Sequence, residues 1–250
     1  MTKKFAVLGS PIEHSPSPKI HNFIFESRGV DASYGRFDVA GELESFLATK
    51  ADYQGFSVTM PLKDQAFALS TELSEVARIT KSVNTLIRVG NGFHGSNTDV
   101  MGIQNAIASQ PESIAVLGSG ATARSALAAF PAAKKLLFAR NPESSAVLAG
   151  EFGAQLVSLD DALESEVVIS TLPPAALPSL ISTRHIKGTL LDVAYTNPEI
   201  KAGRYVSGLL MLIHQAIGQQ RLFNFGDENK PLENEAELLE SLLSLLSMAK

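Results

Sequence analysis

A glycine-rich turn between an apolar run and a helical segment constrains the fold of this chain more than any other feature. Residues 114–117 are short and apolar enough for a buried strand, and the pattern Gly118-x-Gly120-x-x-Ala123 follows at once. Gly118 permits a tight turn, Gly120 leaves the backbone open to close approach, and Ala123 lets the next helix pack on the strand. The amino end of that helix presents unpaired N–H groups that favour a phosphate. The pattern predicts a parallel α/β sheet with a dinucleotide site, the alternative being a tight turn that binds nothing.

The rest of the chain repeats this alternation of strands and helices. We predict strands over 5–8, 32–39, 55–59, 84–89, 114–117, 135–138, 167–170 and 189–192. Segments with helical spacing are 18–28, 42–49, 65–69, 72–79, 103–109, 209–222 and 235–248. This rhythm predicts the α/β class, with an N-terminal α/β domain and a Rossmann-type, doubly wound parallel sheet. We expect the first domain over residues 1–103, completed by helices in 208–250, and the dinucleotide domain over 104–207.

Composition excludes several classes of protein. The chain has 250 residues, of which 45% are hydrophobic and 19% charged, so it can bury a sizeable core. A net charge of −5 argues against a nucleic-acid partner, and the lack of cysteine excludes disulfides and thiolate metal sites. We expect no metal. No apolar stretch approaches the ~18 residues of a membrane span, and the apolar run near the start is too short for a signal peptide. We therefore expect a cytoplasmic protein without a membrane partner.

The end of the second strand in the dinucleotide unit bears on the choice of cofactor. NAD-binding proteins tend to place an acidic residue there, to hold the ribose 2′-hydroxyl. This chain has Phe138-Ala139-Arg140-Asn141, and an arginine can bind a 2′-phosphate with two donors. The sequence therefore favours NADP. NAD stays possible, because the following residues, Pro142-Glu143-Ser144-Ser145, supply no second basic side chain that would strengthen the case.

Three segments of the first unit are dense in small polar side chains. They are residues 15–22, residues 57–63, and residues 82–85 followed by 97–99. Hydroxyls and amides gathered at strand ends can bind a small polyhydroxylated ligand. Each segment also has a structural interpretation, since Ser-Pro pairs form turns and Asp99 can cap a helix.

The order of these segments resembles the shikimate dehydrogenase family. The motifs are Ser15-x-Ser17-Pro18-x-x-His21-Asn22, Val58-Thr59-x-Pro61-x-Lys63, Val83-Asn84-Thr85, Asn97-Thr98-Asp99-x-x-Gly102, the glycine turn, Asp192-Val193-Ala194-Tyr195 and Gly208-Leu-Leu-Met211-Leu-Ile-His214-Gln215. They span roughly residues 5 to 220. The family reduces 3-dehydroshikimate to shikimate with NADPH, in the biosynthesis of chorismate and the aromatic amino acids, and includes monomers and homodimers.

The resemblance implies a role for each matching residue. Lys63 and Asp99 match the polar pair at the reacting carbon, and Ser15 and Ser17 match the pair that holds the substrate carboxylate. The other expected substrate contacts are Thr59, Asn84, Tyr195 and Gln215. The expected cofactor contacts are Gly118, Ser119, Gly120, Ala121, Thr122, Ala123, Arg140, Gly208 and Met211. His14, His21 and His214 are expected to be packing residues or to support the site from behind.

Some positions depart from the family pattern. The family often has asparagine where this chain has Ser57, so one hydrogen bond in that strand must be rearranged. The connection after Tyr195 is also shorter than usual. Two alternatives remain open from the sequence. One is an NAD-dependent quinate/shikimate dehydrogenase, and the other is a sensor that binds shikimate or nucleotide without turnover.

Overall fold

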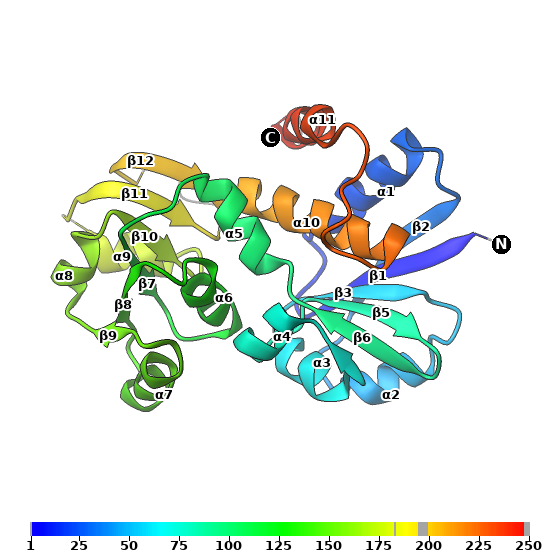
Figure 1. Ribbon diagram of the computed structural model, residues 1–250, viewed down its shortest axis with the longest axis horizontal. Coiled ribbons are helices and arrows are strands. Elements are labelled where there is room, and N and C mark those ends of the chain that lie inside the picture. Colours follow the sequence, from blue (N-terminus) through cyan, green and yellow to red (C-terminus); the bar gives the residue numbers. More distant parts are fainter. Residues whose placement is uncertain (1, 183, 195–199, 248–250) are drawn as a thin grey trace. The chain divides into compact units, whose positions relative to one another are not determined.

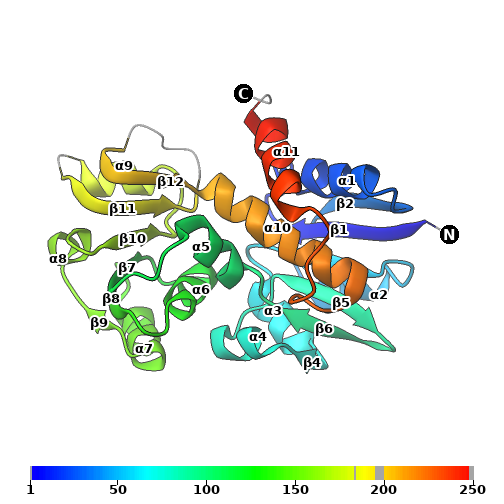
Figure 2. The ribbon, with the colours of Figure 1, turned by 45° about the horizontal axis from the view of Figure 1, so that its top comes forward.

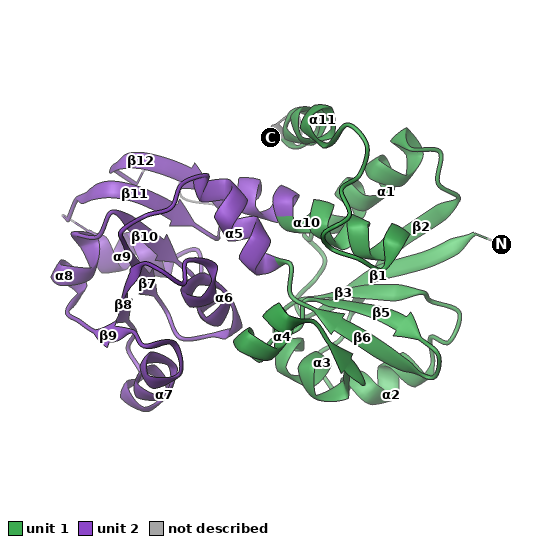
Figure 3. Cartoon of the chain, in the orientation of Figure 1, with its two compact units in different colours: residues 1–98, 215–250 green, residues 99–214 purple. Residues whose placement is uncertain are grey.

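The chain divides into two compact units, coloured separately in Figure 3. The computed structural model describes residues 2–182, 184–194 and 200–247. Unit 1 comprises Met1–Thr98 and Gln215–Lys250, and unit 2 comprises Asp99–His214. The sequence predicts boundaries after residues 103 and 207, whereas helix α5 (Asp99–Ile107) already belongs to unit 2 and helix α10 (Gly208–Phe225) runs through the second division. The first division therefore lies at the first residue of α5, ahead of the predicted boundary, and the second lies within a continuous helix, beyond the predicted boundary.

Unit 1 contains a mixed six-stranded sheet in the order β2-β1-β3-β5-β6-β4. The strands are β1 (Lys3–Gly9), β2 (Ala32–Asp38), β3 (Gly55–Val58), β4 (Glu72–Leu73), β5 (Thr85–Val89) and β6 (Gly92–Ser96). Strand β1 pairs in parallel with β2 and β3, and the hairpin β5–β6 joins β3 in antiparallel fashion. The carboxyl ends of β1 and β3 therefore lie at one edge of the sheet, next to the amino end of β5.

Side chains of β1 alternate between two hydrophobic layers, as expected for a central strand. The helices of unit 1 are α1 (Ser17–Ser27), α2 (Leu43–Ala48), α3 (Lys63–Leu69), α4 (Glu75–Thr80), the end of α10, and α11 (Glu235–Ser247). Phe5 and Val7 pack in one cluster with Phe25 of α1 and Phe223 of α10. Ala6 and Leu8 pack in the other cluster, with side chains of α2, α3 and α4. Figure 1 shows these two sets of helices on opposite faces of the sheet.

Unit 2 contains a six-stranded sheet in the order β12-β11-β10-β7-β8-β9, with every neighbouring pair parallel. The strands are β7 (Ser113–Leu117), β8 (Lys134–Phe138), β9 (Gln155–Leu156), β10 (Val167–Ser170), β11 (Ile186–Asp192) and β12 (Ala202–Ser207). Numbered from β7, this is the order 3-2-1-4-5-6 of the doubly wound dinucleotide-binding fold. The predicted Rossmann-type sheet is confirmed.

Helices of unit 2 cover the sheet through small and branched side chains. They are α5, α6 (Ala121–Ala129), α7 (Pro142–Phe152), α8 (Leu159–Leu163), α9 (Ala176–Ile181) and the start of α10. A core cluster joins Ala115 and Leu117 of β7 to Leu163 of α8 and Leu177 of α9. Helices α5 and α6 lie side by side, as Figure 2 shows, and Gln104 Nε2 donates to the Ala129 carbonyl at 2.7 Å.

One predicted element is wrong in detail, and one strand was missed. The segment 72–79, predicted as one helix, begins with strand β4, because the Ser74 hydroxyl accepts from Ala77 N and starts α4 only at Glu75. Strand β12 was not predicted from the sequence, and its edge position explains why Ala202, Gly203 and Arg204 lack the apolar signal of a central strand. Within residues 2–182, 184–194 and 200–247, no helix is long and apolar enough to cross a membrane.

Candidate active site

The loop after β1 and the segment after β3 are held together at the edge of the unit 1 sheet. Thr59 N donates to the Leu8 carbonyl at 2.9 Å, and Ser10 N donates to the Met60 carbonyl at 2.9 Å. A Cβ at Gly9 would collide with the Thr59 methyl group, so glycine allows this close approach. The half-buried Thr59 thus lies at the edge where we expect the substrate.

Ser15 and Ser17 lie together in the turn that starts α1. Ser17 N donates to Ser15 Oγ at 3.3 Å, and Ser15 N donates to the Ile12 carbonyl at 3.0 Å. Ser17 is buried and Ser15 is half-buried. Two hydroxyls held in one turn can bind a carboxylate without a net positive charge.

Asn84 is at the centre of a buried polar cluster in unit 1. Its Nδ2 donates to Gln215 Oε1 at 3.3 Å and to Thr98 Oγ1 at 3.0 Å, and its Oδ1 accepts from Thr98 N at 2.9 Å. Asn84 and Gln215 are 2% and 7% exposed, so their amides are pre-oriented and shielded from bulk water. The structure brings together these two predicted residues, which are 131 positions apart in the sequence.

Lys63 and Asp99 are both buried, at 9% and 5% exposure respectively. Lys63 begins helix α3, and its carbonyl accepts from Val83 N at 3.3 Å, next to Asn84 in the chain. Asp99 begins helix α5 as the first residue of unit 2, directly after Thr98 of the Asn84 cluster. Buried charged residues are uncommon in protein cores unless they are paired or serve a functional site.

Gln219 extends the Asn84 cluster deeper into unit 1 and was not predicted from the sequence. Its Nε2 donates to the Asn84 carbonyl and to Thr85 Oγ1, both at 3.1 Å. Its Oε1 accepts from Ser57 Oγ at 2.8 Å, and Ser57 Oγ accepts from the Tyr34 hydroxyl at 2.5 Å. Gln219 follows Gln215 by four residues on one helix, so the helical period was a signal that could have identified it.

His21 lies behind this cluster as a neutral packing residue, in agreement with the sequence prediction. Its ring stacks on Tyr34 with centroids 4.2 Å apart. Its Nδ1 accepts from Gln220 Nε2 at 2.9 Å, which leaves the proton on Nε2 to be donated to Gln219 Oε1 at 3.2 Å. Burial lowers the pKa of His21 to about 3, with the Gln219 hydrogen bond acting in the opposite sense. His21 is therefore not a proton carrier near neutral pH.

The glycine-rich turn of unit 2 has the geometry expected for a dinucleotide. Gly118 has a φ of +118°, and a Cβ there would collide with Thr171 Oγ1, so only glycine suits this position. Gly120 precedes α6 without a side-chain cap, and a Cβ at Gly120 meets no atom within 4 Å. The turn therefore leaves open space beside uncapped N–H groups at the start of a nine-residue helix, which fits a pyrophosphate.

Other residues predicted to contact the cofactor lie around the same edge of the unit 2 sheet. Gly118 N donates to the Phe138 carbonyl at 2.9 Å, which places the turn beside the end of β8, and Arg140 is exposed two residues later. The Ser119 hydroxyl is 3.1 Å from the Ser144 hydroxyl. These contacts fit an adenosine 2′-phosphate near Arg140. The predicted residues Ala121, Thr122 and Ala123 form the first turn of α6.

Gly208 and Met211 lie at the start of α10. A Cβ at Gly208 would collide with the carbonyl oxygens of Asp192 and Val193, so this glycine packs against the end of β11. Met211 is buried at 5% exposure. Tyr195, a predicted substrate contact, lies outside the described residues.

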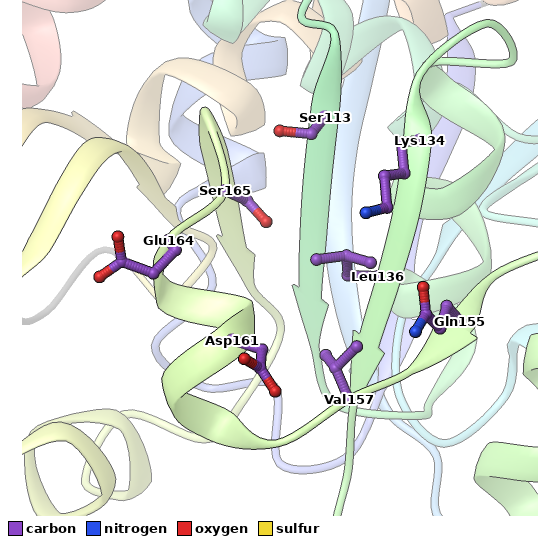
Figure 4. Close-up of a pocket in the computed structure, with 8 residues that line it drawn as sticks. All are labelled: Ser113, Lys134, Leu136, Gln155, Val157, Asp161, Glu164 and Ser165. Atoms are coloured by element: carbon purple, nitrogen blue, oxygen red, sulfur yellow. The ribbon is translucent and has the colours of Figure 1, made fainter.

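A separate depression in unit 2 lies away from the glycine turn and is shown in Figure 4. It has a volume of about 430 Å³ and lies near the amino ends of β7, β8 and β10. In a parallel sheet, this is the edge opposite the carboxyl ends where nucleotides bind. Its lining residues are Ser113, Lys134, Leu136, Gln155, Val157, Asp161, Glu164 and Ser165.

Family models match both units. Residues 7–86 match the shikimate dehydrogenase substrate binding domain, and residues 113–194 match a model described as NADP oxidoreductase, coenzyme F420-dependent. Curated relatives include a pentafunctional AROM polypeptide of Candida glabrata, 33% identical over 269 residues. That alignment covers 90% of this chain and 17% of the relative. A shikimate dehydrogenase (NADP(+)) of Acinetobacter baumannii is 40% identical over 134 residues, half of each chain. The chain thus spans at most half the length of these curated relatives.

Solved structures match the chain along nearly its whole length. The shikimate dehydrogenase of Mycobacterium tuberculosis is 32% identical with a TM-score of 0.83, covering 98% of this chain and 99% of that one. The shikimate 5-dehydrogenase of Thermus thermophilus, in complex with NADP(H) and shikimate, is 28% identical with a TM-score of 0.85. That match covers 98% of this chain and all of the other. By its sequence motifs, its two folds and these matches, the chain belongs to the shikimate dehydrogenase family.

Proposed function

We propose that this protein catalyses the NADP-dependent interconversion of 3-dehydroshikimate and shikimate. The observation that carries the proposal is the buried amide pair of Asn84 and Gln215, whose Nδ2–Oε1 distance is 3.3 Å, in the unit that also buries Lys63. Such groups suit a ring with several hydroxyls, each of which needs donors and acceptors once water is excluded. The open glycine turn of unit 2 suits the dinucleotide.

Each polar residue that the family motifs mark for the substrate has a place in this proposal. Ser15 and Ser17 bind the substrate carboxylate through their hydroxyls. Thr59, Asn84 and Gln215 bind the ring hydroxyls. Tyr195 is assigned to the substrate on the family motif alone. This division leaves Lys63 and Asp99 for the carbon that reacts.

Lys63 and Asp99 manage the proton of the reaction. When bound, NADPH supplies a hydride to the carbonyl carbon of 3-dehydroshikimate. The carbonyl oxygen gains negative charge as that bond forms, and the Lys63 ammonium donates a proton to it, which gives the hydroxyl of shikimate. The Asp99 carboxylate orients Lys63 and accepts a hydrogen bond from the neighbouring hydroxyl. In the reverse direction Lys63 takes up the proton.

Residues of unit 2 hold the cofactor. The N–H groups at the start of α6 bind the pyrophosphate, and the exposed Arg140 binds the 2′-phosphate. Gly208 and Met211 lie against the nicotinamide end. Arg140 is the feature that separates NADP from NAD in this proposal.

A single assay tests the proposal against both alternatives. The protein is mixed with shikimate and either NADP or NAD, and the absorbance of the reduced nicotinamide is followed. We expect a clear rise with NADP and a much weaker one with NAD. Binding of shikimate without turnover by either cofactor would instead indicate a sensor. A larger response with NAD, or with quinate as substrate, would indicate the quinate/shikimate dehydrogenase.

A further inference from the structure

A directed chain of hydrogen bonds crosses unit 1 from the surface-side strand β2 to Asn84. The Tyr34 hydroxyl donates to Ser57 Oγ at 2.5 Å, and Ser57 Oγ donates to Gln219 Oε1 at 2.8 Å. On the other side of the amide, Gln219 Nε2 donates to Thr85 Oγ1 at 3.1 Å. Thr85 Oγ1 then donates to Asn84 Oδ1 at 2.7 Å. Tyr34, Ser57, Thr85, Gln219 and Asn84 are each at most 4% exposed.

This series of hydrogen bonds can run in only one direction, because the donors and acceptors of the Gln219 amide are all used. Its oxygen accepts from Ser57 and His21, and its nitrogen donates to Thr85 and to the Asn84 carbonyl. Rotating this amide by 180° would set its oxygen against the Asn84 carbonyl oxygen and its NH2 group against the His21 Nε2 proton. The Asn84 carbonyl and the neutral His21 therefore fix the orientation of Gln219, and the Tyr34–Ser57 pair holds its oxygen in place.

Gln219 also helps to hold Asn84. Thr85 Oγ1 accepts from Gln219 Nε2 and donates its own proton to Asn84 Oδ1. With Oδ1 held by Thr85 and by Thr98 N, the Asn84 Nδ2 group is directed towards Gln215. An Asn84 amide turned the other way would present an acceptor where the cluster now presents donors.

We propose that Tyr34 and Ser57 are positioning residues that hold Gln219, and through Gln219 and Thr85 the Asn84 amide, in place for the substrate. This rests on the proposed function, which takes Asn84 as a substrate contact. The Ser57 hydroxyl reaches Gln219, but by itself it could rotate its proton away from the Gln219 oxygen. The Tyr34 hydroxyl occupies its acceptor side and leaves its proton for Gln219.

The first test replaces Tyr34 with phenylalanine, which keeps the ring stacked on His21 and removes only the hydroxyl. We expect the KM for shikimate to rise about 3- to 10-fold, the effect of one net hydrogen bond, with kcat and the KM for NADP nearly unchanged. Tyr53→Phe is the matched control, because Tyr53 packs on the same sheet against Phe37 and Phe56, outside this chain of bonds. Its KM for shikimate should match that of the original protein.

A second pair of variants separates the hydroxyl of Ser57 from its shape. Ser57→Thr keeps the hydroxyl, and Ser57→Val has nearly the same shape as the threonine variant but lacks the hydroxyl. We expect the threonine variant to keep most of its shikimate affinity and the valine variant to lose about as much as Tyr34→Phe. Thermal unfolding of every variant is recorded, since a purely structural role would lower the melting midpoint without separating KM from kcat.

A double variant tests whether Tyr34 acts through Asn84. In the Asn84→Ala background, Tyr34→Phe should change the KM for shikimate by less than about twofold, because the group it positions is gone. Equal effects of Tyr34→Phe with and without Asn84 would overturn the proposal, as would identical behaviour of Tyr34→Phe and Tyr53→Phe. If the unmodified protein neither binds nor oxidises shikimate, the proposed function itself fails. If the unmodified protein is active but Tyr34→Phe has no effect, only the positioning role fails.

Discussion

At the scale of single residues, Lys63 carries the proton step and can be tested alone. Lys63→Ala should lower kcat by about 10²- to 10⁴-fold, because it removes the general acid, while shikimate binding weakens by less than about threefold. Binding is measured by calorimetry and turnover by nicotinamide absorbance. Lys201→Ala, at an exposed lysine of unit 2, is the control and should be fully active. Normal turnover of bound substrate by Lys63→Ala would contradict the proton-transfer role.

His21 makes the stability of the protein sensitive to acid. Its pKa is about 3 in the folded protein and the usual 6.5 in the unfolded chain, so the unfolded chain binds more protons between these values. Stability therefore falls as the pH decreases from 6.5, and at pH 5 the loss from this residue is about 2 kcal/mol.

Urea unfolding at pH 7.5 and pH 5.0 measures this contribution. The difference in unfolding free energy between the two pH values should shrink by about 2 kcal/mol in His21→Gln. It should stay the same in His185→Gln, because His185 is exposed. An unchanged pH dependence in His21→Gln would show that other groups cause the acid sensitivity.

Single residues also show what sequence reasoning can and cannot find. Asn84 and Gln215 were predicted because family motifs mark them, and the structure places them in contact. Tyr34 and Ser57 were not assigned to the site. They meet only because β1 pairs with both β2 and β3, which brings two distant strands within reach of one hydroxyl pair. No local pattern in the sequence contains that register.

At the scale of elements, the turn between β7 and α6 can be tested by filling its open space. Gly120→Ala adds a methyl group that meets no protein atom within 4 Å, so the melting midpoint should change little. The same methyl group would occupy the space assigned to the pyrophosphate. We expect the KM for NADP to rise at least about tenfold, with the KM for shikimate unchanged. Gly150→Ala in α7 also meets no atom and is the control.

The end of β8 provides a second test at this scale. Arg140→Ala should reduce the preference for NADP over NAD, measured as the ratio of the two kcat/KM values, because a bidentate contact to the 2′-phosphate is lost. Arg184→Ala, which breaks an exposed ion pair with Asp160, should leave the ratio as it is. A ratio unmoved by Arg140→Ala would mean that another residue recognises the phosphate.

The elements of the core were more predictable than those at the sheet edges. Central strands such as β7 and β10 are continuous apolar runs, and both were predicted from that signal alone. The edge strands β4, β9 and β12 are short or half exposed, so they lack a continuous apolar run. The boundaries of the units were also hard to place, because α5 begins at Asp99, ahead of the helix predicted from residue 103, and α10 continues without a break across the second division.

At the scale of the whole molecule, the two units should respond to different ligands. Each has its own core, and unit 1 carries most of the contacts assigned to the substrate, apart from Asp99 and Tyr195, whereas unit 2 carries all those assigned to the cofactor. Shikimate should slow amide hydrogen exchange mainly in residues 57–63, 84–98 and 215–220. Adenosine 2′,5′-bisphosphate should slow it in residues 117–125. Hydrogen exchange measured by mass spectrometry on the full chain tests this prediction. Protection of residues 117–125 by shikimate alone would contradict the assignment of substrate and cofactor to different units.

Unit 1 is assembled from both ends of the chain, and this has a consequence for synthesis on the ribosome. Ser57, Thr85 and Asn84 emerge early, but the amide of Gln219 that satisfies them is made only after all of unit 2. At about 5–20 residues per second, that interval is on the order of ten seconds. The contiguous second unit can complete its fold during the wait. Until helix α10 is synthesised, the nascent amino-terminal segment therefore contains polar groups that lack their hydrogen-bond partners. We expect this to be the stage of synthesis at which the segment depends most on chaperones.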